Sequence, residues 1–287
     1  MRTRLLPLLA ATAAAAVVVA AGSAAAAPAK VSPIETAANA TVTSSYSYRM
    51  SLRLTTPSAP TPLTIRVSGV SQHDPQVIEM KMDMTDLMKA SGAPAANGVY
   101  TMILAGSPKA PVFYLSGGVF KQLLPAGRTW ARVDGARYTK IAGTDLSKQL
   151  SNGADISSFL SVLKAAGATV VKTGSEPVGK TPATRYRVTV AVDRMLESQG
   201  FSAAEVAKQK ASYRTKSVAY DVWLDGHERP LRMLLNLPVQ SQGQKIDELI
   251  DMTLSDFGSA AKVSVPDASL VKDITSVLAA QVKKSAG

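Results

Sequence analysis

Apolar and polar residues alternate one by one in many short segments of this chain, and this period of two most constrains what the chain can fold into. In residues 46–54, Tyr, Met and Leu alternate with Ser and Arg. Successive side chains of a β-strand point to opposite faces of a sheet, so the pattern predicts a strand with one solvated face. The pattern recurs at residues 63–67, 78–84 and 185–192. Apolar runs predict further strands at residues 100–104, 112–115, 130–133, 218–224, 231–237 and 250–254.

Residues that favour turns separate neighbouring strands. Pro57–Pro62 and Asp225-Gly226 are two such segments. Because the strands follow one another through short turns, we expect an antiparallel meander with one face in water.

Helical spacing is confined to a few segments. Ser157–Ala166 is one, with Gly167 as the residue that ends it. Asp193 can cap a short turn, and Ser202 with Glu205 forms a capping box that opens a helix through Ala211. A last amphipathic helix is expected over Asp267–Leu278.

These few helices must cover the apolar side of the whole sheet, and a flat sheet of that width would leave apolar area exposed. We therefore predict an α+β fold in which a strongly curved antiparallel sheet, a half-barrel of about 9–11 strands, wraps around a few helices.

The first residues have the three parts of a secretory signal. Arg2 and Arg4 precede an apolar run over residues 5–21, and small residues follow at 22–27. A retained membrane helix is the alternative, but the run is largely alanine. We expect cleavage after Ala26 and a single domain over residues 27–287. The chain has no cysteine that could carry lipid at the junction or form a disulfide. The mature protein is expected to be soluble, secreted and extracytoplasmic, in the cell envelope.

The chain is basic. Loss of Arg2 and Arg4 would lower its formal net charge from +11 to about +9. Outside the cytoplasm the polyanions are anionic membrane surfaces and wall polymers, which we expect as partners in place of nucleic acid. Alternatively, the surplus of Lys and Arg only makes the surface soluble.

Residues 174–181, Gly-Ser-Glu-Pro-Val-Gly-Lys-Thr, match the phosphate-loop pattern of nucleotide-binding proteins. That mechanism needs a helix to begin at the Gly-Lys-Thr. Here Pro182 follows at once, and a clear strand begins at Arg185. We therefore interpret the segment as a hairpin turn and expect no nucleotide.

Other catalytic patterns are weak. The two histidines, His73 and His227, lie in turn-like contexts, and Ser116-Gly117-Gly118 lacks the preceding glycine of a nucleophile elbow. Neither histidine has the neighbours of a zinc site. Asp247, Glu248 and Asp251 are spaced as on a solvated strand edge, and a carboxylate pair for glycoside hydrolysis stays open. We expect no enzyme, cofactor or metal.

Methionine gives a hint of function. Most methionines after residue 26 fall on the apolar faces of predicted strands. Methionine adapts to varied apolar shapes, which favours a surface that accommodates a ligand. The alternative is an ordinary core.

Three groups of residues resemble strand motifs of exported actinobacterial proteins in the LolA/LprG-like superfamily. They are residues 130–134, residues 182–190, and residues 220–226 with Arg229-Pro230. The similarity runs over most of residues 40–265. It implies a half-barrel of antiparallel strands around helices, with an apolar cavity that carries lipid or the acyl chains of lipoproteins. The chain departs from many relatives because it lacks the lipobox cysteine.

Together these observations predict an exported, non-enzymatic binding protein or carrier for an amphiphilic lipid or acyl chain. The alternative is an envelope-associated interaction or sensor domain of the same fold, with a closed core and a basic surface for anionic wall polymers. The residues expected to line the apolar cavity are Met50, Leu52, Leu54, Met80, Met82, Met84, Met102, Val222, Leu224, Met233, Leu235 and Met252.

Overall fold

The computed structural model describes residues 32–57, 61–107, 110–143, 167–198, 201–241 and 243–286. The expected signal segment and the helix expected at Ser157–Ala166 lie outside the described residues, as does part of the Pro57–Pro62 turn.

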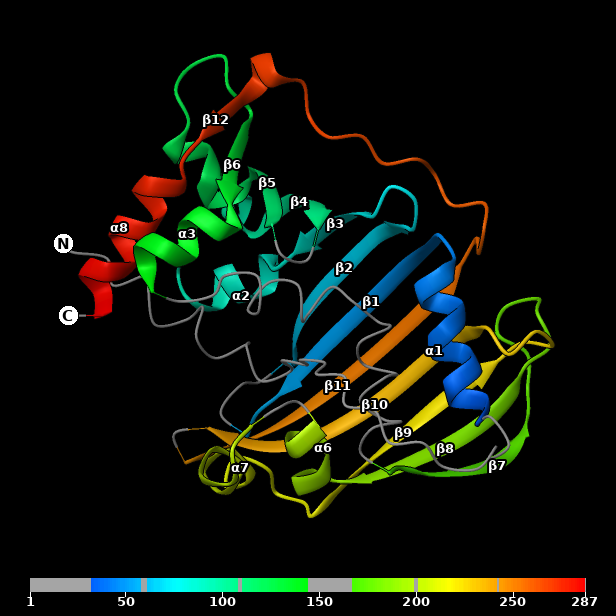
Figure 1. The fold of residues 1–287 in the computed structure, drawn as a ribbon. Coiled ribbons are helices and arrows are strands. Elements are labelled where there is room, and N and C mark those ends of the chain that lie inside the picture. The colour runs from blue at the N-terminus through cyan, green and yellow to red at the C-terminus, as the bar shows by residue number, and fades with distance from the viewer. Residues whose placement is uncertain are drawn as a thin grey trace.

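The described strands form one sheet in the order β12-β6-β5-β4-β3-β2-β1-β11-β10-β9-β8-β7. All neighbours are antiparallel except β12 and β6. The sheet is strongly curved and carries helices on one side (Figure 1). This confirms the predicted fold class, with twelve strands in the described part of the chain where the sequence predicts about 9–11. The strands are β1 (Tyr46–Thr55), β2 (Leu63–Gln72), β3 (Val77–Asp83), β4 (Val99–Ser107), β5 (Ala110–Gly117), β6 (Trp130–Asp134), β7 (Thr169–Ser175), β8 (Thr184–Ala191), β9 (Ser217–Leu224), β10 (Pro230–Ser241), β11 (Gln244–Ser255) and β12 (Val271–Asp273).

Two meanders make up this sheet. Strands β1 to β6 pair in sequence order, and so do β7 to β11. The two meanders are joined at the centre of the sheet by β1 and β11. These two strands pair over nine residues, from Ser47↔Ser255 to Thr55↔Asp247. Residues about 200 positions apart in the sequence therefore share the middle of the sheet.

Most described helices bury side chains in the same apolar core as one face of the sheet. Ile34 of α1, Tyr138 of α3, Leu196 of α6 and Val206 of α7 all belong to it. We call this face the inner face and the opposite one the outer face. The helices are α1 (Pro33–Thr43), α2 (Thr85–Ala90), α3 (Gly135–Ala142), α6 (Val192–Ser198), α7 (Ala203–Lys210) and α8 (Thr275–Ala286), with 3-10 turns η2 (Ala95–Gly98), η3 (Gly118–Leu123) and η4 (Ala268–Leu270).

The capping box predicted for α7 is present. The Ser202 hydroxyl accepts a hydrogen bond from the Glu205 amide, and the Glu205 carboxylate accepts one from the Ser202 amide at 2.8 Å. Helix α6 begins beside Asp193, as expected. Helices α1, α2 and α3 are additional to the prediction. In α1, residues Ile34, Ala37, Ala38 and Thr41 are buried at helical spacing.

The prediction of one continuous helix over Asp267–Leu278 is wrong. The segment instead contains η4, the short strand β12 and the start of α8. Strand β12 pairs in parallel with β6, and the Asp273 carboxylate lies 2.7 Å from the Arg132 guanidinium. The same carboxylate accepts a hydrogen bond from the Thr275 amide, which starts α8 after the strand.

Residues 174–181 form a hairpin, as predicted. Strand β7 ends at Ser175, Val178 and Thr181 form a bridge, and β8 begins at Thr184. Gly179 has a φ of +61°, which suits a tight turn. No helix begins at the Gly-Lys-Thr, so the amides that a phosphate loop needs are missing from this segment.

One glycine is required by close packing across the centre of the sheet. Gly69 of β2 lies opposite Tyr48 of β1, whose hydroxyl donates a hydrogen bond to the Glu79 carbonyl at 3.4 Å. A Cβ atom at Gly69 would lie 2.7 Å from the Tyr48 hydroxyl and would also overlap the Glu79 carbonyl. The Tyr48 ring therefore occupies space that a side chain at residue 69 would need.

We predict that Gly69→Ala lowers the free energy of unfolding by about 1–3 kcal/mol, because the ring or the strand must shift. Gly226→Ala is the control, since a Cβ there meets no atom within 4 Å. Chemical denaturation of both variants measures the difference. Equal stability of the two variants would contradict the proposed packing.

Candidate functional site: the inner face of the sheet

The register of the sheet places one continuous row of large side chains across the inner face. Directly opposite residues of antiparallel strands point to the same side. The row crosses eight strands, from β8 to β4, and four of its members are methionines. It consists of Tyr186, Val222, Met233, Met252, Met50, Val67, Met82 and Tyr100.

The residues expected to line a cavity fall into two groups of different exposure. One group is buried in the core and consists of Met80, Met102, Val222, Leu224, Met233 and Leu235. The other group packs against that core but keeps part of its surface exposed. We call it the apolar strip, and it consists of Met50, Leu52, Leu54, Met82, Met84 and Met252.

Four members of the apolar strip lie at the centre of the sheet. Met252 on β11 is directly opposite Met50 on β1, and Leu52 and Leu54 follow along β1. Met82 lies two strands away from Met50, beyond Val67. Met84 was expected on a strand but lies just after β3, where it precedes α2. The strand ends at Asp83 because the Asp83 carboxylate accepts a hydrogen bond from the Thr85 amide at 2.9 Å.

The structure adds half-buried inner-face residues that the sequence analysis did not select. Ile250 lies opposite both Leu52 and Leu235, and Ile246 lies opposite Val239. Both are partly buried against the core. The period of two in β11 could have identified them, because they continue the alternation that includes Met252.

Tyr100 and Glu248 place polar groups on the inner face beside the apolar strip. The Tyr100 hydroxyl donates to the sulfur of Met82 at 2.8 Å, and burial raises the pKa of Tyr100 to about 12. Glu248 lies opposite Leu54 on one side and Leu237 on the other. Burial raises the pKa of its carboxyl, and no hydrogen bond or ion pair to that carboxylate occurs within the described residues.

The three clustered carboxylates of the sequence are therefore separated in the fold. Asp247 and Asp251 lie on the outer face, where they pair with Arg214 and Arg232, whereas Glu248 lies on the inner face. His73 and His227 are exposed. Within the described ranges, no three His, Cys, Asp or Glu side chains are grouped as metal ligands would be.

The outer face of β8 to β11 carries paired charges. The Asp221 carboxylate accepts hydrogen bonds from both Arg187 and Arg185 at 2.7–2.8 Å. The Trp223 ring lies between two guanidinium groups, with that of Arg185 at 5.0 Å and that of Arg232 at 5.1 Å. The two guanidinium groups cover the faces of the Trp223 ring. The arginines of this region therefore all contact a carboxylate, an aromatic ring or both.

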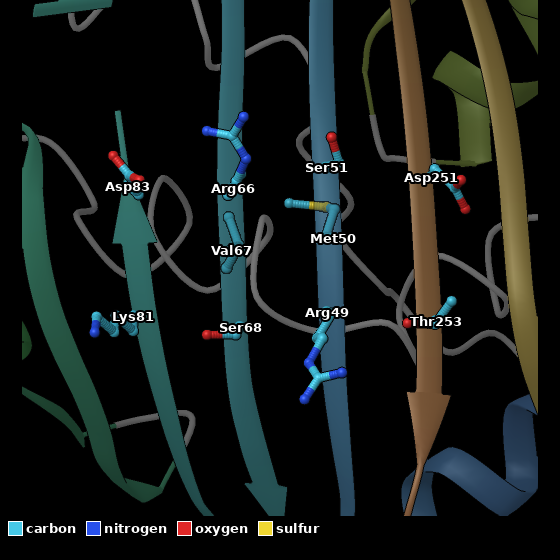
Figure 2. A pocket seen from close by; sticks show the side chains of 10 residues that line it. All are labelled: Arg49, Met50, Ser51, Arg66, Val67, Ser68, Lys81, Asp83, Asp251 and Thr253. Atoms are coloured by element: carbon cyan, nitrogen blue, oxygen red, sulfur yellow. The ribbon is translucent and has the colours of Figure 1, made fainter. Parts of the chain in front are cut away.

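A hollow of about 520 Å³ lies beside that region, over β11, β1, β2 and β3. Figure 2 shows the side chains around it, with α1 behind the sheet. Its lining residues are Arg49, Met50, Ser51, Arg66, Val67, Ser68, Lys81, Asp83, Asp251 and Thr253. The charged and hydroxyl-bearing side chains of the lining point to the outer face, while Met50, a member of the apolar strip, and Val67 also contribute to it.

None of the described helices is both long enough and apolar enough to span a bilayer.

No family model and no curated protein matches the sequence. Among solved structures, the chain is similar to the lipoprotein LppX of Mycobacterium tuberculosis, at 13% identity and a TM-score of 0.43, over 81% of this chain and 96% of that one. It is similar to LprF from Mycobacterium bovis at 12% identity and a TM-score of 0.41, over 82% and 94%. A LolA superfamily protein from Nitrosomonas europaea matches at 11% identity and a TM-score of 0.29, over 86% and 99%.

The position of Glu248 predicts a pH-dependent stability. Because its folded pKa is raised, the folded state favours the protonated carboxyl, and stability is lost as the pH rises from the unfolded value of 4.5 through the folded value. Glu248→Gln removes this loss. We therefore expect the variant to be more stable than the wild type at pH 7, with a difference that shrinks below about pH 4.5.

Thermal unfolding at several pH values measures this difference. Glu228→Gln is the control, because Glu228 is exposed in the turn before β10. A Glu248→Gln variant that is less stable than the wild type at pH 7 would show that the carboxylate has a stabilising partner.

Proposed function

We propose that this protein is an exported, non-enzymatic carrier that holds the acyl chains of an amphiphilic lipid against the inner face of its sheet. The observation that carries the proposal is the apolar strip. A closed core would bury all of its side chains. The apolar strip instead keeps exposed surface on the same face of the sheet as fully buried neighbours, and it consists of Met50, Leu52, Leu54, Met82, Met84 and Met252.

The chemistry of the strip suits acyl chains of varied shape. Each methylene removed from water contributes about 0.8 kcal/mol, so a long chain gains much of its binding free energy from length alone. Methionine side chains are unbranched and polarisable, and they can adjust to a cargo without a fixed shape. A rigid core would favour branched residues such as Val188, Val190 and Val218, which are buried on β8 and β9.

The polar groups beside the strip would face the other end of such a cargo. The Tyr100 hydroxyl has a methionine sulfur as its acceptor, which is a weak one. A hydroxyl or carbonyl of a lipid would accept a stronger hydrogen bond from it. We propose that the headgroup end of the cargo lies toward Tyr100 and the acyl chains along Met50, Leu52 and Met252.

We also propose that residues 27–287 act as one domain after removal of the signal segment. The pairing of β1 with β11 supports this, because it joins the two meanders through a shared ladder of hydrogen bonds.

The proposal predicts different outcomes for two methionine-to-tryptophan substitutions. Met252→Trp fills space in the apolar strip, so the melting temperature should change little while uptake of a fluorescent fatty-acyl probe falls. Met102→Trp is the matched control, because Met102 is only 4% exposed. Overfilling the core there should cost about 1–3 kcal/mol.

Both variants are measured by thermal unfolding and by probe titration. Equal losses of stability in the two variants, with no probe binding by the wild type, would exclude the carrier function and favour a closed core.

A further inference from the structure

The outer-face hollow has a physical origin in the sequence of its strands. On β1 and β2, long basic residues alternate with serine along the outer face, as Arg49 and Ser51 do on β1. Register places Ser68 of β2 directly opposite Arg49 on one side and Lys81 on the other. The short serine side chains leave the floor of the hollow open, and the long cationic side chains stand around it (Figure 2).

Three of the residues that line the hollow are cations, on β1, β2 and β3. Arg49 and Lys81 lie on the strands adjacent to Ser68, so their Cα atoms are about 10 Å apart across β2. Arg66 lies on β2 itself, two residues before Ser68 and on the same face. In the structure the Arg66 guanidinium and the Lys81 ammonium extend away from Ser68 (Figure 2), and these long, flexible side chains can turn toward a bound anion.

These cations lack the partners that their neighbours have. Within the part of the chain that the structure describes, Arg49, Arg66 and Lys81 form no ion pair within 4.0 Å. On the same face of the sheet, Arg185 and Arg232 both have carboxylate partners.

The two carboxylates beside the hollow are already engaged. Asp251 accepts two hydrogen bonds from Arg232, at 2.9 and 2.7 Å. Asp83 accepts one from the Thr85 amide, and its hydrogen bonds with Thr85 lower the pKa of its carboxyl. Asp83 lies opposite Arg66, and the charges of Arg66 and Lys81 both help to lower the pKa of its carboxyl, so this carboxylate offsets part of the charge of these two cations. The hollow therefore keeps a net positive charge together with the hydroxyls of Ser51, Ser68 and Thr253.

We propose that this hollow binds a phosphate group. A phosphate accepts hydrogen bonds from several directions and matches the fork of an arginine, while lysine acts on it as a compact charge. Serine hydroxyls at the floor donate to the remaining oxygens. A volume of about 520 Å³ exceeds the needs of one phosphate and leaves space for the group that bears it.

The phosphate can come from a lipid headgroup at a membrane surface or from a soluble phosphate ester. The cations and hydroxyls of the site point to the opposite face of β1, β2 and β3 from Met82, and Met50 is the one member of the apolar strip that also lines the hollow.

The first test is a calorimetric titration of the purified protein with inorganic phosphate at constant ionic strength. Saturable binding is expected for the wild type. Lys81→Glu should weaken it at least tenfold. Lys245→Glu is the matched control, because Lys245 is an exposed cation on β11, about 20 Å along the strand from Asp251. Both substitutions change the net charge equally.

Phosphate binding that is absent in the wild type, or reduced equally by the two substitutions, would overturn the proposal. If Lys81→Glu fails to give the wild-type circular dichroism spectrum, Arg49→Gln replaces it, since it removes one cation of the same hollow without adding an anion.

The second test distinguishes the sources of the phosphate by co-sedimentation with phosphatidylglycerol vesicles. Pelleting that is lost in Lys81→Glu and retained in Lys245→Glu supports the site with a lipid headgroup as its ligand. Saturable binding of inorganic phosphate without such pelleting supports the site with a soluble phosphate ester as its ligand. Neither result depends on uptake of a fatty-acyl probe, so failure of this proposal is separate from failure of the carrier function.

Discussion

The register of the antiparallel sheet is the constraint on which the other features depend. Directly opposite residues share a face, so a slip of one residue in any strand would move its apolar side chains from the core to solvent. The nine matched pairs between β1 and β11 fix this register at the centre. They put Met50 beside Met252 on one side of the sheet and Ser51 beside Asp251 on the other.

The two faces use that register differently. On the inner face, helices cover much of the apolar surface, while the apolar strip keeps part of its own exposed. On the outer face, Arg185, Arg187 and Arg232 are held by Asp221 and Asp251, and Trp223 lies between two of them. The neighbouring cations over β1 to β3 have no such partners among the described residues. The strands that support the proposed cargo thus also carry the proposed phosphate site.

The sequence predicts most of the sheet, because the period of two directly reflects alternation of burial, and it predicts α7 from its capping box. It does not predict the break of Asp267–Leu278 into β12 and α8, since that break depends on Arg132, 141 residues away from Asp273. The extent to which each side chain of the candidate site is buried also depends on residues that are distant in the sequence. Met80 and Met82 look alike in sequence, yet Met80 is 3% exposed and Met82 is half-buried. The hollow could not be predicted either, because it needs the register of four strands at once.

The central claim is that the exposed surface of the apolar strip is covered by an acyl chain when the protein acts. Native mass spectrometry of the protein, purified from producing cells without detergent, tests this most directly. A bound amphiphile should appear as a discrete added mass that organic solvent removes and that solvent analysis identifies as a lipid. A single mass equal to that of the bare polypeptide, unchanged after incubation with lipid vesicles, would contradict the account.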